Sequence, residues 1–150
     1  MVLALEGARV YAHGKMRKQG LFMDTHIRSH AVPNAQALDC KGLWVLPGFI
    51  DAHVHFRVPG GEHKEDWKTG SLAAAHGGIT TVMDMPNTNP STTTLQAWRQ
   101  KNEAAQRDSV VNYAFHFGAA KDNFEEALKI PGIRSVKMYM GSSTGNLLVD

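Results

Sequence analysis

Residues 46–57 read LPGFIDAHVHFR, an apolar run that ends in two histidines one residue apart and then an arginine. Side chains alternate between the two faces of a β-strand, so His53 and His55 should point the same way and can share one metal ion. A chance His-x-His pair on the surface is the alternative, because the chain has eight histidines. The apolar residues within 44–50 predict burial instead, and buried imidazoles need partners. We therefore interpret this stretch as a metal-binding strand end.

The chain after this stretch alternates between strand and helix patterns. A strand at about 49–56 precedes a helix at about 65–76, which ends at Gly77-Gly78. The elements expected next are a strand at 79–84, a helix at 95–106 capped by a threonine of 92–94, a strand at 110–117, a helix capped by Asp122 in which Glu125 and Lys129 are spaced to pair, and a strand at 133–140. Such repeats predict a parallel sheet.

The polar residues of these repeats converge on one edge of the predicted sheet. They fall at or just beyond the C-terminal ends of the strands, where parallel α/β folds carry their functional groups: His53, His55, Asp84, Asn87 and Lys137. A complete (β/α)8 barrel needs about 250 residues. Residues 46–150 are therefore interpreted as the truncated first half of a TIM-type barrel, with about four β-α units. An open flavodoxin-like sheet is the alternative.

Residues 1–45 lack a helical period and read as short strands, with turns at His13-Gly14, Gln19-Gly20 and Pro33-Asn34. They predict a small β-element that precedes the α/β part. Cys40 is the only cysteine of the chain, so it is expected to be a packed side chain and not part of a disulfide.

The composition excludes several classes of partner. The net charge is +2 and the basic residues are scattered, which argues against nucleic acid or an anionic membrane and favours a small molecule. The sequence has neither a stretch long enough to span a bilayer nor a signal-peptide pattern at its start. We expect a cytoplasmic location.

Five short motifs resemble the amidohydrolase superfamily, and most closely the dihydroorotases of its cyclic-amidohydrolase group. The matching pieces are residues 47–57 (PGFIDAHVHFR), 59–60 (PG), 64–66 (KED), 77–81 (GGITT) and 85–88 (MPNT). The resemblance is dense over 46–90 and resumes at 136–150. It implies a (β/α)8 barrel, and residues 1–45 match as part of the β-sandwich domain that accompanies it.

The resemblance also implies a metal centre. His53 and His55 would bind a divalent metal, usually zinc, and Lys137 stands where many members carry a carboxylated lysine that bridges to a second ion. Other members have an aspartate there. A buried lysine loses its proton more easily and can then add carbon dioxide. The apolar neighbours Val136, Met138 and Met140 favour burial over the alternative of a solvated lysine.

Arg57 and Asn87 point to the substrate. In the resembled family, residues at these positions bind the carboxylate of dihydroorotate, as an arginine fork and an amide donor can. Alternatively, Arg57 pairs with an acid and Asn87 shapes its turn. Asp51 suits a supporting or packing role and Asp84 could orient the Asn87 loop, whereas His116 is assigned no role.

The implied activity is a zinc-dependent dihydroorotase that interconverts dihydroorotate and N-carbamoyl-aspartate in pyrimidine biosynthesis. The general acid/base aspartate and two more histidines are expected beyond Asp150, so the isolated segment should be inactive, and the complete protein is expected to be a homo-oligomer. The alternatives are a hydantoinase or dihydropyrimidinase, an allantoinase, or a non-catalytic dihydroorotase-like structural subunit.

Overall fold

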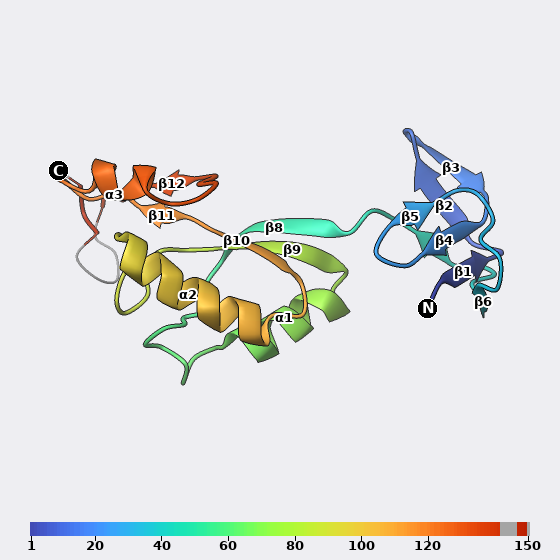
Figure 1. Ribbon diagram of the computed structural model, residues 1–150, viewed down its shortest axis with the longest axis horizontal. Coiled ribbons are helices and arrows are strands. Elements are labelled where there is room, and N and C mark those ends of the chain that lie inside the picture. Colours follow the sequence, from blue (N-terminus) through green and yellow to red (C-terminus); the bar gives the residue numbers. More distant parts are fainter. Residues whose placement is uncertain (142–146, 150) are drawn as a thin grey trace. The chain divides into compact units, whose positions relative to one another are not determined.

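The computed structural model of the chain describes residues 1–141 and 147–149, and it divides into two compact units (Figure 1). The first unit is Met1–Pro47 and the second is Gly48–Asp150. Among the described helices, none combines the length and the hydropathy that a membrane crossing requires.

The first unit consists of two small sheets. One has the order β5-β4-β1-β6 and the other β3-β2-β7. Their strands are β1 (Leu3–Glu6), β2 (Arg9–Ala12), β3 (Lys15–Lys18), β4 (Leu21–Met23), β5 (Ile27–Arg28), β6 (Gln36–Asp39) and β7 (Trp44–Val45). A core around Val10, Leu21 and Cys40 is buried between them, so the cysteine is a packed side chain as predicted. The predicted turns at His13 and Asn34 have positive φ angles of 51° and 59°.

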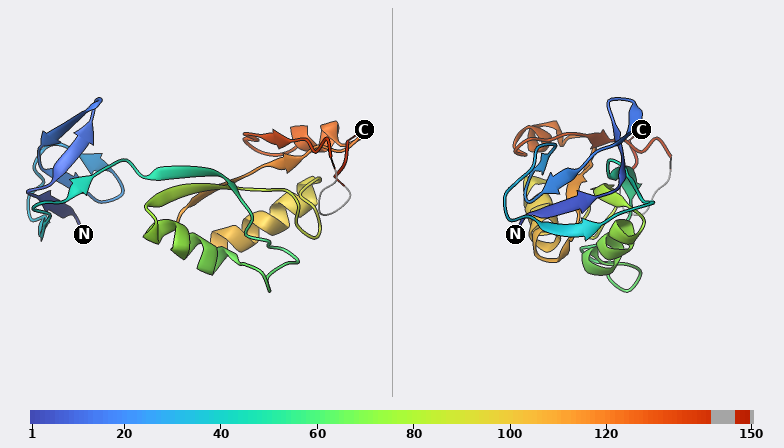
Figure 2. Two further views of the ribbon diagram at one scale, coloured as in Figure 1. Left: turned by 180° about the vertical axis from the view of Figure 1, so that it is seen from behind. Right: turned by 90° about the vertical axis from the view of Figure 1, so that its right-hand side faces the viewer.

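The second unit is mixed α/β and contains a parallel three-stranded sheet in the order β10-β9-β8. The chain runs β8 (Phe49–Val54), α1 (Trp67–His76), β9 (Ile79–Asp84), α2 (Leu95–Asp108) and β10 (Asn112–Phe115). Both helices cover the same face of this sheet (Figures 1 and 2). The remaining elements are β11 (Phe117–Gly118), α3 (Phe124–Leu128) and β12 (Val136–Lys137), with β11 and β12 paired in parallel.

Side-chain caps fix where the two longer helices begin. The Asp66 carboxylate accepts a hydrogen bond from the Thr69 backbone N–H at 2.7 Å, so α1 begins at Trp67. The Thr94 hydroxyl accepts from the Ala97 N–H at 3.1 Å, which confirms that a threonine of 92–94 caps α2. At the other end of α1, Gly78 turns the chain into β9 with a φ of +78°, which glycine adopts without strain.

Trp67 is the centre of the core under the sheet. It is 1% exposed, and its ring contacts Phe56 edge-on with centroids 4.9 Å apart, and Phe115 at 5.8 Å. Gly70 in α1 makes room for this cluster, because a Cβ atom there would lie 2.7 Å from the Phe56 ring. The aromatic contacts hold α1 against the strands that carry the polar strand ends.

A fully buried ion pair joins the sheet to α2. The Asp84 and Lys101 side chains are both 0% exposed, and Asp84 Oδ2 lies 2.6 Å from Lys101 Nζ. Burial lowers the pKa of Lys101, whereas the neighbouring carboxylate acts in the opposite direction. Lys101 also donates to the Met85 carbonyl at 2.6 Å and to the Thr92 hydroxyl at 3.3 Å, so its ammonium group has two hydrogen bonds in addition to the ion pair.

The third and fourth expected strands differ from the prediction. The strand expected at 110–117 is interrupted at His116, where its partner changes from β9 to the segment of β12. The strand expected at 133–140 is reduced to Val136–Lys137, followed by an isolated bridge between Tyr139 and Leu148. A strand that changes its partner part-way along forms shorter paired segments than an apolar run suggests.

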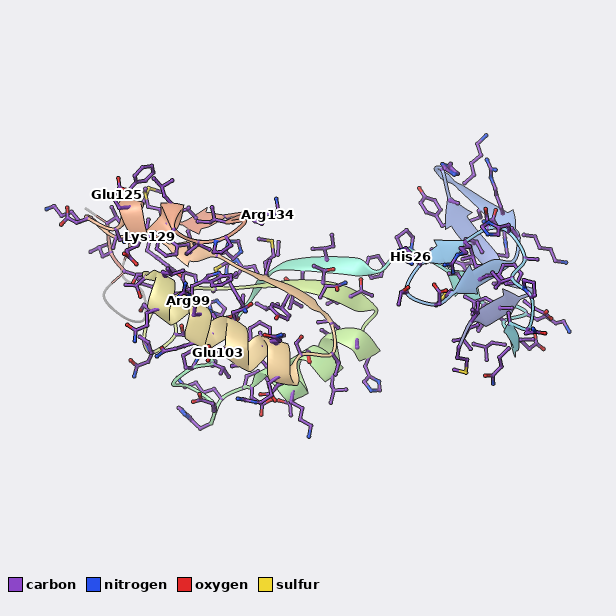
Figure 3. The ribbon with its side chains drawn as sticks, in the orientation of Figure 1. His26, Arg99, Glu103, Glu125, Lys129 and Arg134 are labelled. Carbon is purple, nitrogen blue, oxygen red and sulfur yellow. The ribbon has the colours of Figure 1, made fainter. Side chains whose placement is uncertain are left out.

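Two predictions about α3 were wrong. Asn123, not Asp122, is the N-cap residue, and its side-chain oxygen accepts from the Ala120 N–H outside the helix. Lys129 pairs with Glu126 three residues earlier, not with Glu125. Figure 3 labels Glu125 and Lys129. Both spacings bring side chains together on a helix, so the sequence alone does not choose between them.

The predicted burial of the apolar run before the histidines was also wrong. Trp44 is 64%, Phe49 57% and Ile50 68% exposed. Phe49 and Ile50 lie on β8, an edge strand of the described sheet, and the described helices cover only one face of that sheet, so side chains of this strand can remain exposed. Trp44 lies on β7 in the first unit.

Replacing Lys101 with methionine should lower the free energy of unfolding by about 3–5 kcal/mol, because the Asp84 carboxylate stays buried without its partner. Urea unfolding at neutral pH measures this change. The exposed Lys121→Met is the matched control and should change stability by less than about 0.5 kcal/mol. Equal losses for the two variants would contradict a structural role for the buried pair.

Candidate metal centre

His53 and His55 lie side by side where β8 ends. Their ring centroids are 5.3 Å apart and the ring planes are inclined by 53°. His53 is exposed and His55 is partly buried. The two rings are therefore close enough to face a single ion.

Asn87 fixes the state of the His55 ring. Asn87 Oδ1 lies 2.9 Å from His55 Nδ1, and an amide oxygen only accepts hydrogen bonds, so Nδ1 carries the hydrogen and Nε2 keeps a free lone pair. Burial lowers the pKa of His55, and the nearby Arg57 guanidinium lowers it further. The neutral ring, with Nε2 available, is the form that binds a metal cation.

A β-bulge includes the first histidine of the pair. Asp51 pairs with Val82 and Val54 pairs with Asp84, so the two residues Ala52 and His53 face the single residue between those partners. The peptide that joins Ala52 to His53 bonds to side chains at both ends. Its N–H donates to the Asp51 carboxylate at 3.0 Å, and its carbonyl accepts from His116 Nε2 at 2.8 Å. Bulges next to functional sites turn a side chain away from the regular alternation.

Arg57 lies in a tight loop directly after the histidines. Its φ angle is +65°, an uncommon conformation for a residue with a side chain. The loop packs on the segment after Asn87, because the Asn89 N–H donates to the Pro59 carbonyl at 2.9 Å. Gly60 permits this approach, since a Cβ atom there would lie 2.3 Å from the Asn89 carbonyl oxygen. A cavity beside β8 is lined by both His55 and Arg57.

Lys137 is partly buried and lies farther along the sheet. Its ammonium nitrogen is 5.3 Å from the centre of the Tyr139 ring. The flanking Val136 and Met138 are each 55% exposed and Met140 is 85% exposed, so the predicted burial by these neighbours was wrong. β12 has two residues and pairs only with β11 among the described strands, which leaves its side chains open.

The structure thus brings His53, His55 and Asn87 into contact and places Arg57 beside them. No hydrogen bond or ring contact within residues 1–141 and 147–149 joins Lys137 to the histidines. In the same residues, no three side chains of histidine, cysteine, aspartate or glutamate form a group that could hold a metal ion. The described residues supply two histidines, and a complete metal coordination sphere would need further ligands.

Lys101 supports this site and was not identified from the sequence. Its pair with Asp84 lies under the strand ends: Asp84 Oδ1 accepts from the Phe56 N–H at 2.7 Å, between His55 and Arg57. The sequence contains a weak indication that Lys101 is buried. Lys101 lies four residues from both Ala97 and Ala105, which places it on the buried face of α2.

Curated proteins similar to this chain include dihydroorotases of archaea. The dihydroorotase of Methanothermobacter thermautotrophicus is 54% identical over 121 residues, which cover 77% of this chain and 27% of that protein. The dihydroorotase of Halobacterium salinarum is 39% identical over 153 residues, which cover 99% of this chain and 32% of that protein. The chain spans about a third or less of the length of these relatives.

Solved structures with a similar fold include L-hydantoinase from Arthrobacter aurescens, with a TM-score of 0.85 and 26% identity over 98% of this chain and 35% of that chain. The dihydropyrimidinase from Brevibacillus agri has a TM-score of 0.79 and 27% identity, and covers 100% of this chain and 35% of its own. The sequence pattern of the amidohydrolase family matches residues 44–141. The chain, with its histidine pair at the end of a parallel strand, belongs to the amidohydrolase family.

Proposed function

We propose that this chain is the N-terminal part of a dihydroorotase, which interconverts dihydroorotate and N-carbamoyl-aspartate. The observation that carries the proposal is the grouping of a histidine pair, Asn87 and Arg57 at one sheet edge. The similarity to dihydroorotases supports it, at 54% identity over 121 residues for one relative. In this proposal Gly48–Asp150 is the first part of a (β/α)8 barrel, and Met1–Pro47 is part of a β-sandwich domain.

The donor set fits a divalent cation, for which zinc is our candidate. His53 and His55 would hold it, since neutral imidazoles suit zinc and Asn87 leaves Nε2 of His55 free. When bound, such a cation lowers the pKa of water toward neutrality and polarises a carbonyl group. Two side chains would orient these ligands. Asn87 holds the ring of His55, and Asp51 holds the backbone N–H of His53.

Arg57 and Asn87 would bind the substrate carboxylate. A guanidinium offers two parallel N–H donors to a carboxylate, and Asn87 keeps its amide N–H groups for the substrate while its oxygen is engaged by His55. Fixing the carboxylate orients the ring amide toward the histidines. In hydrolysis, water adds to the ring carbonyl, the C–N bond breaks, and the nitrogen takes the proton.

Lys137 would become the bridge to a second cation after its neutral amine adds carbon dioxide. The support is its position at the end of β12, together with the family pattern. The general acid/base aspartate and two further histidines would come from residues beyond Asp150. The 150-residue segment by itself should therefore not turn over dihydroorotate.

A hydantoinase or dihydropyrimidinase activity is the second candidate, favoured by the similar folds of L-hydantoinase and dihydropyrimidinase. Its substrates lack the carboxylate that Arg57 would bind. Sequence identity is 26–27% to these enzymes and 54% to a dihydroorotase, so we rank the second candidate lower.

Removal of either histidine should abolish metal binding at this site. In the full product of the coding sequence, we expect His53→Ala and His55→Ala to weaken zinc by more than about 100-fold, beyond the effect typical of an outer contact. Competition with a chelating indicator measures the affinity, and the exposed His76→Ala is the control. A wild-type protein that binds no zinc would instead favour a non-catalytic structural subunit.

Arg57→Met separates the two candidate substrates. Loss of a charge-assisted hydrogen bond should raise KM for dihydroorotate by about 10- to 100-fold. Turnover of dihydrouracil, which lacks the carboxylate, should not change. Steady-state kinetics of the full product measure both, with the exposed Arg99→Met as the control. Unchanged kinetics with dihydroorotate would point to the hydantoinase class.

Lys137→Met tests the bridge. We expect the wild-type protein to hold two zinc ions and to show a carbamate carbon signal after incubation with ¹³C-bicarbonate, because an added carboxylate is needed between two cations. The variant should lose the signal and at least one ion, while Lys121→Met keeps both. Metal analysis and NMR give the readouts, and an unaltered metal content in Lys137→Met would exclude the bridging role.

A further inference from the structure

We propose that His116 is a positioning residue for His53: it holds the peptide between Ala52 and His53 in the bulge that aims the His53 imidazole. The inference rests on the proposed role of His53 as a metal ligand. It assigns a task to a histidine that the reaction itself does not use.

The bulge needs such a support. A regular parallel ladder would pair the backbone of Ala52 and His53 with β9, but the register shift leaves one residue too many on β8. A peptide outside the ladder must find other partners for its N–H and carbonyl groups. Asp51 accepts from the N–H at 3.0 Å, and His116 donates to the carbonyl at 2.8 Å. Together they clamp the peptide that carries His53.

The backbone places His116 where the sheet changes its pairing. Its own N–H donates to the Asp84 carbonyl on β9 at 3.0 Å, and the next residue, Phe117, donates to the Ser135 carbonyl. His116 therefore separates β10 from β11, and its ring reaches past β9 to β8. A break in the strand gives this side chain access to a carbonyl two strands away.

Hydrogen bonding fixes one form of the ring. The Ala52 carbonyl only accepts, so Nε2 of His116 carries the hydrogen. Nδ1 lies 2.7 Å from the Ser135 hydroxyl oxygen, so both ring nitrogens are engaged. Ser135 lies two residues before Lys137, so the same ring also links the backbone of His53 to the segment that leads into β12.

The engaged nitrogens distinguish this role from that of a third metal ligand. A ligand needs a free lone pair on one ring nitrogen, as His55 has on Nε2. In His116, Nδ1 is engaged by the Ser135 hydroxyl and Nε2 carries a hydrogen that is donated to Ala52. The chemistry that His116 can supply here is a single N–H donated to a carbonyl.

The test compares a variant without a donor with a variant that keeps one. In the full product of the coding sequence, His116→Leu retains bulk but cannot donate, whereas His116→Gln retains an amide N–H for the Ala52 carbonyl. We expect His116→Leu to weaken zinc binding by about 10- to 100-fold, the range for residues that orient a ligand, and His116→Gln to recover most of that loss. Competition with a chelating indicator gives the affinity, the absorption spectrum of the cobalt form reports ligand geometry, and the melting temperature reports folding. The exposed His76→Ala is the control.

Each outcome of this comparison either supports or contradicts the inference. Wild-type affinity in His116→Leu overturns the inference, and equal losses in the Leu and Gln variants overturn it in favour of direct ligation. If His116→Leu does not fold, Ser135→Ala replaces it: loss of the hydroxyl that orients the ring should weaken zinc by a smaller factor, and no change contradicts the clamp. If His53→Ala itself leaves zinc binding intact, the proposed metal centre fails, which is a different outcome from failure of the clamp.

Discussion

The Asp84 carboxylate is the interaction on which the site depends. It receives the N–H of Phe56, between His55 and Arg57, and it neutralises Lys101, which in turn holds the Met85 carbonyl just before the Asn87 loop. A buried carboxylate is costly unless it is paired and hydrogen-bonded, and here each demand is met by a different element. The ends of β8 and β9 and the middle of α2 therefore keep one relative arrangement, and the functional side chains extend from it.

Much of the α/β unit could be predicted from local signals. The period of the sequence and the capping threonines located β9 and α2, and the His-x-His spacing predicted the paired imidazoles. Parallel pairing then required the histidines and Asn87 to meet at one edge. These features follow from alternation and handedness, which are properties of short segments.

Other features depend on contacts between distant segments and were missed for that reason. A lysine on a helix is normally solvated, and the burial of Lys101 depends on a charged partner, Asp84, that lies seventeen residues earlier. The partner of His116 is a carbonyl freed by a bulge 64 residues away. The apolar neighbours of His53 and Lys137 predicted burial, but burial requires a covering layer, and none covers that face within the described residues. The sequence shows that a side chain is apolar, but it does not show which residues pack against that side chain.

The core under the helices and the end of β8 have different roles. The face under α1 and α2 holds the aromatic cluster and the ion pair, where close packing gives rigidity. The end of β8 carries the histidine pair, and hydrogen bonds from side chains set its geometry: Asn87 bonds to one ring, and Asp51 and His116 bond to one peptide. A ligand on an edge strand has few packing neighbours to orient it, so directional hydrogen bonds must do so. The bulge at Ala52 and His53 frees backbone groups to receive such bonds, and both groups of the peptide between these residues are bound by side chains.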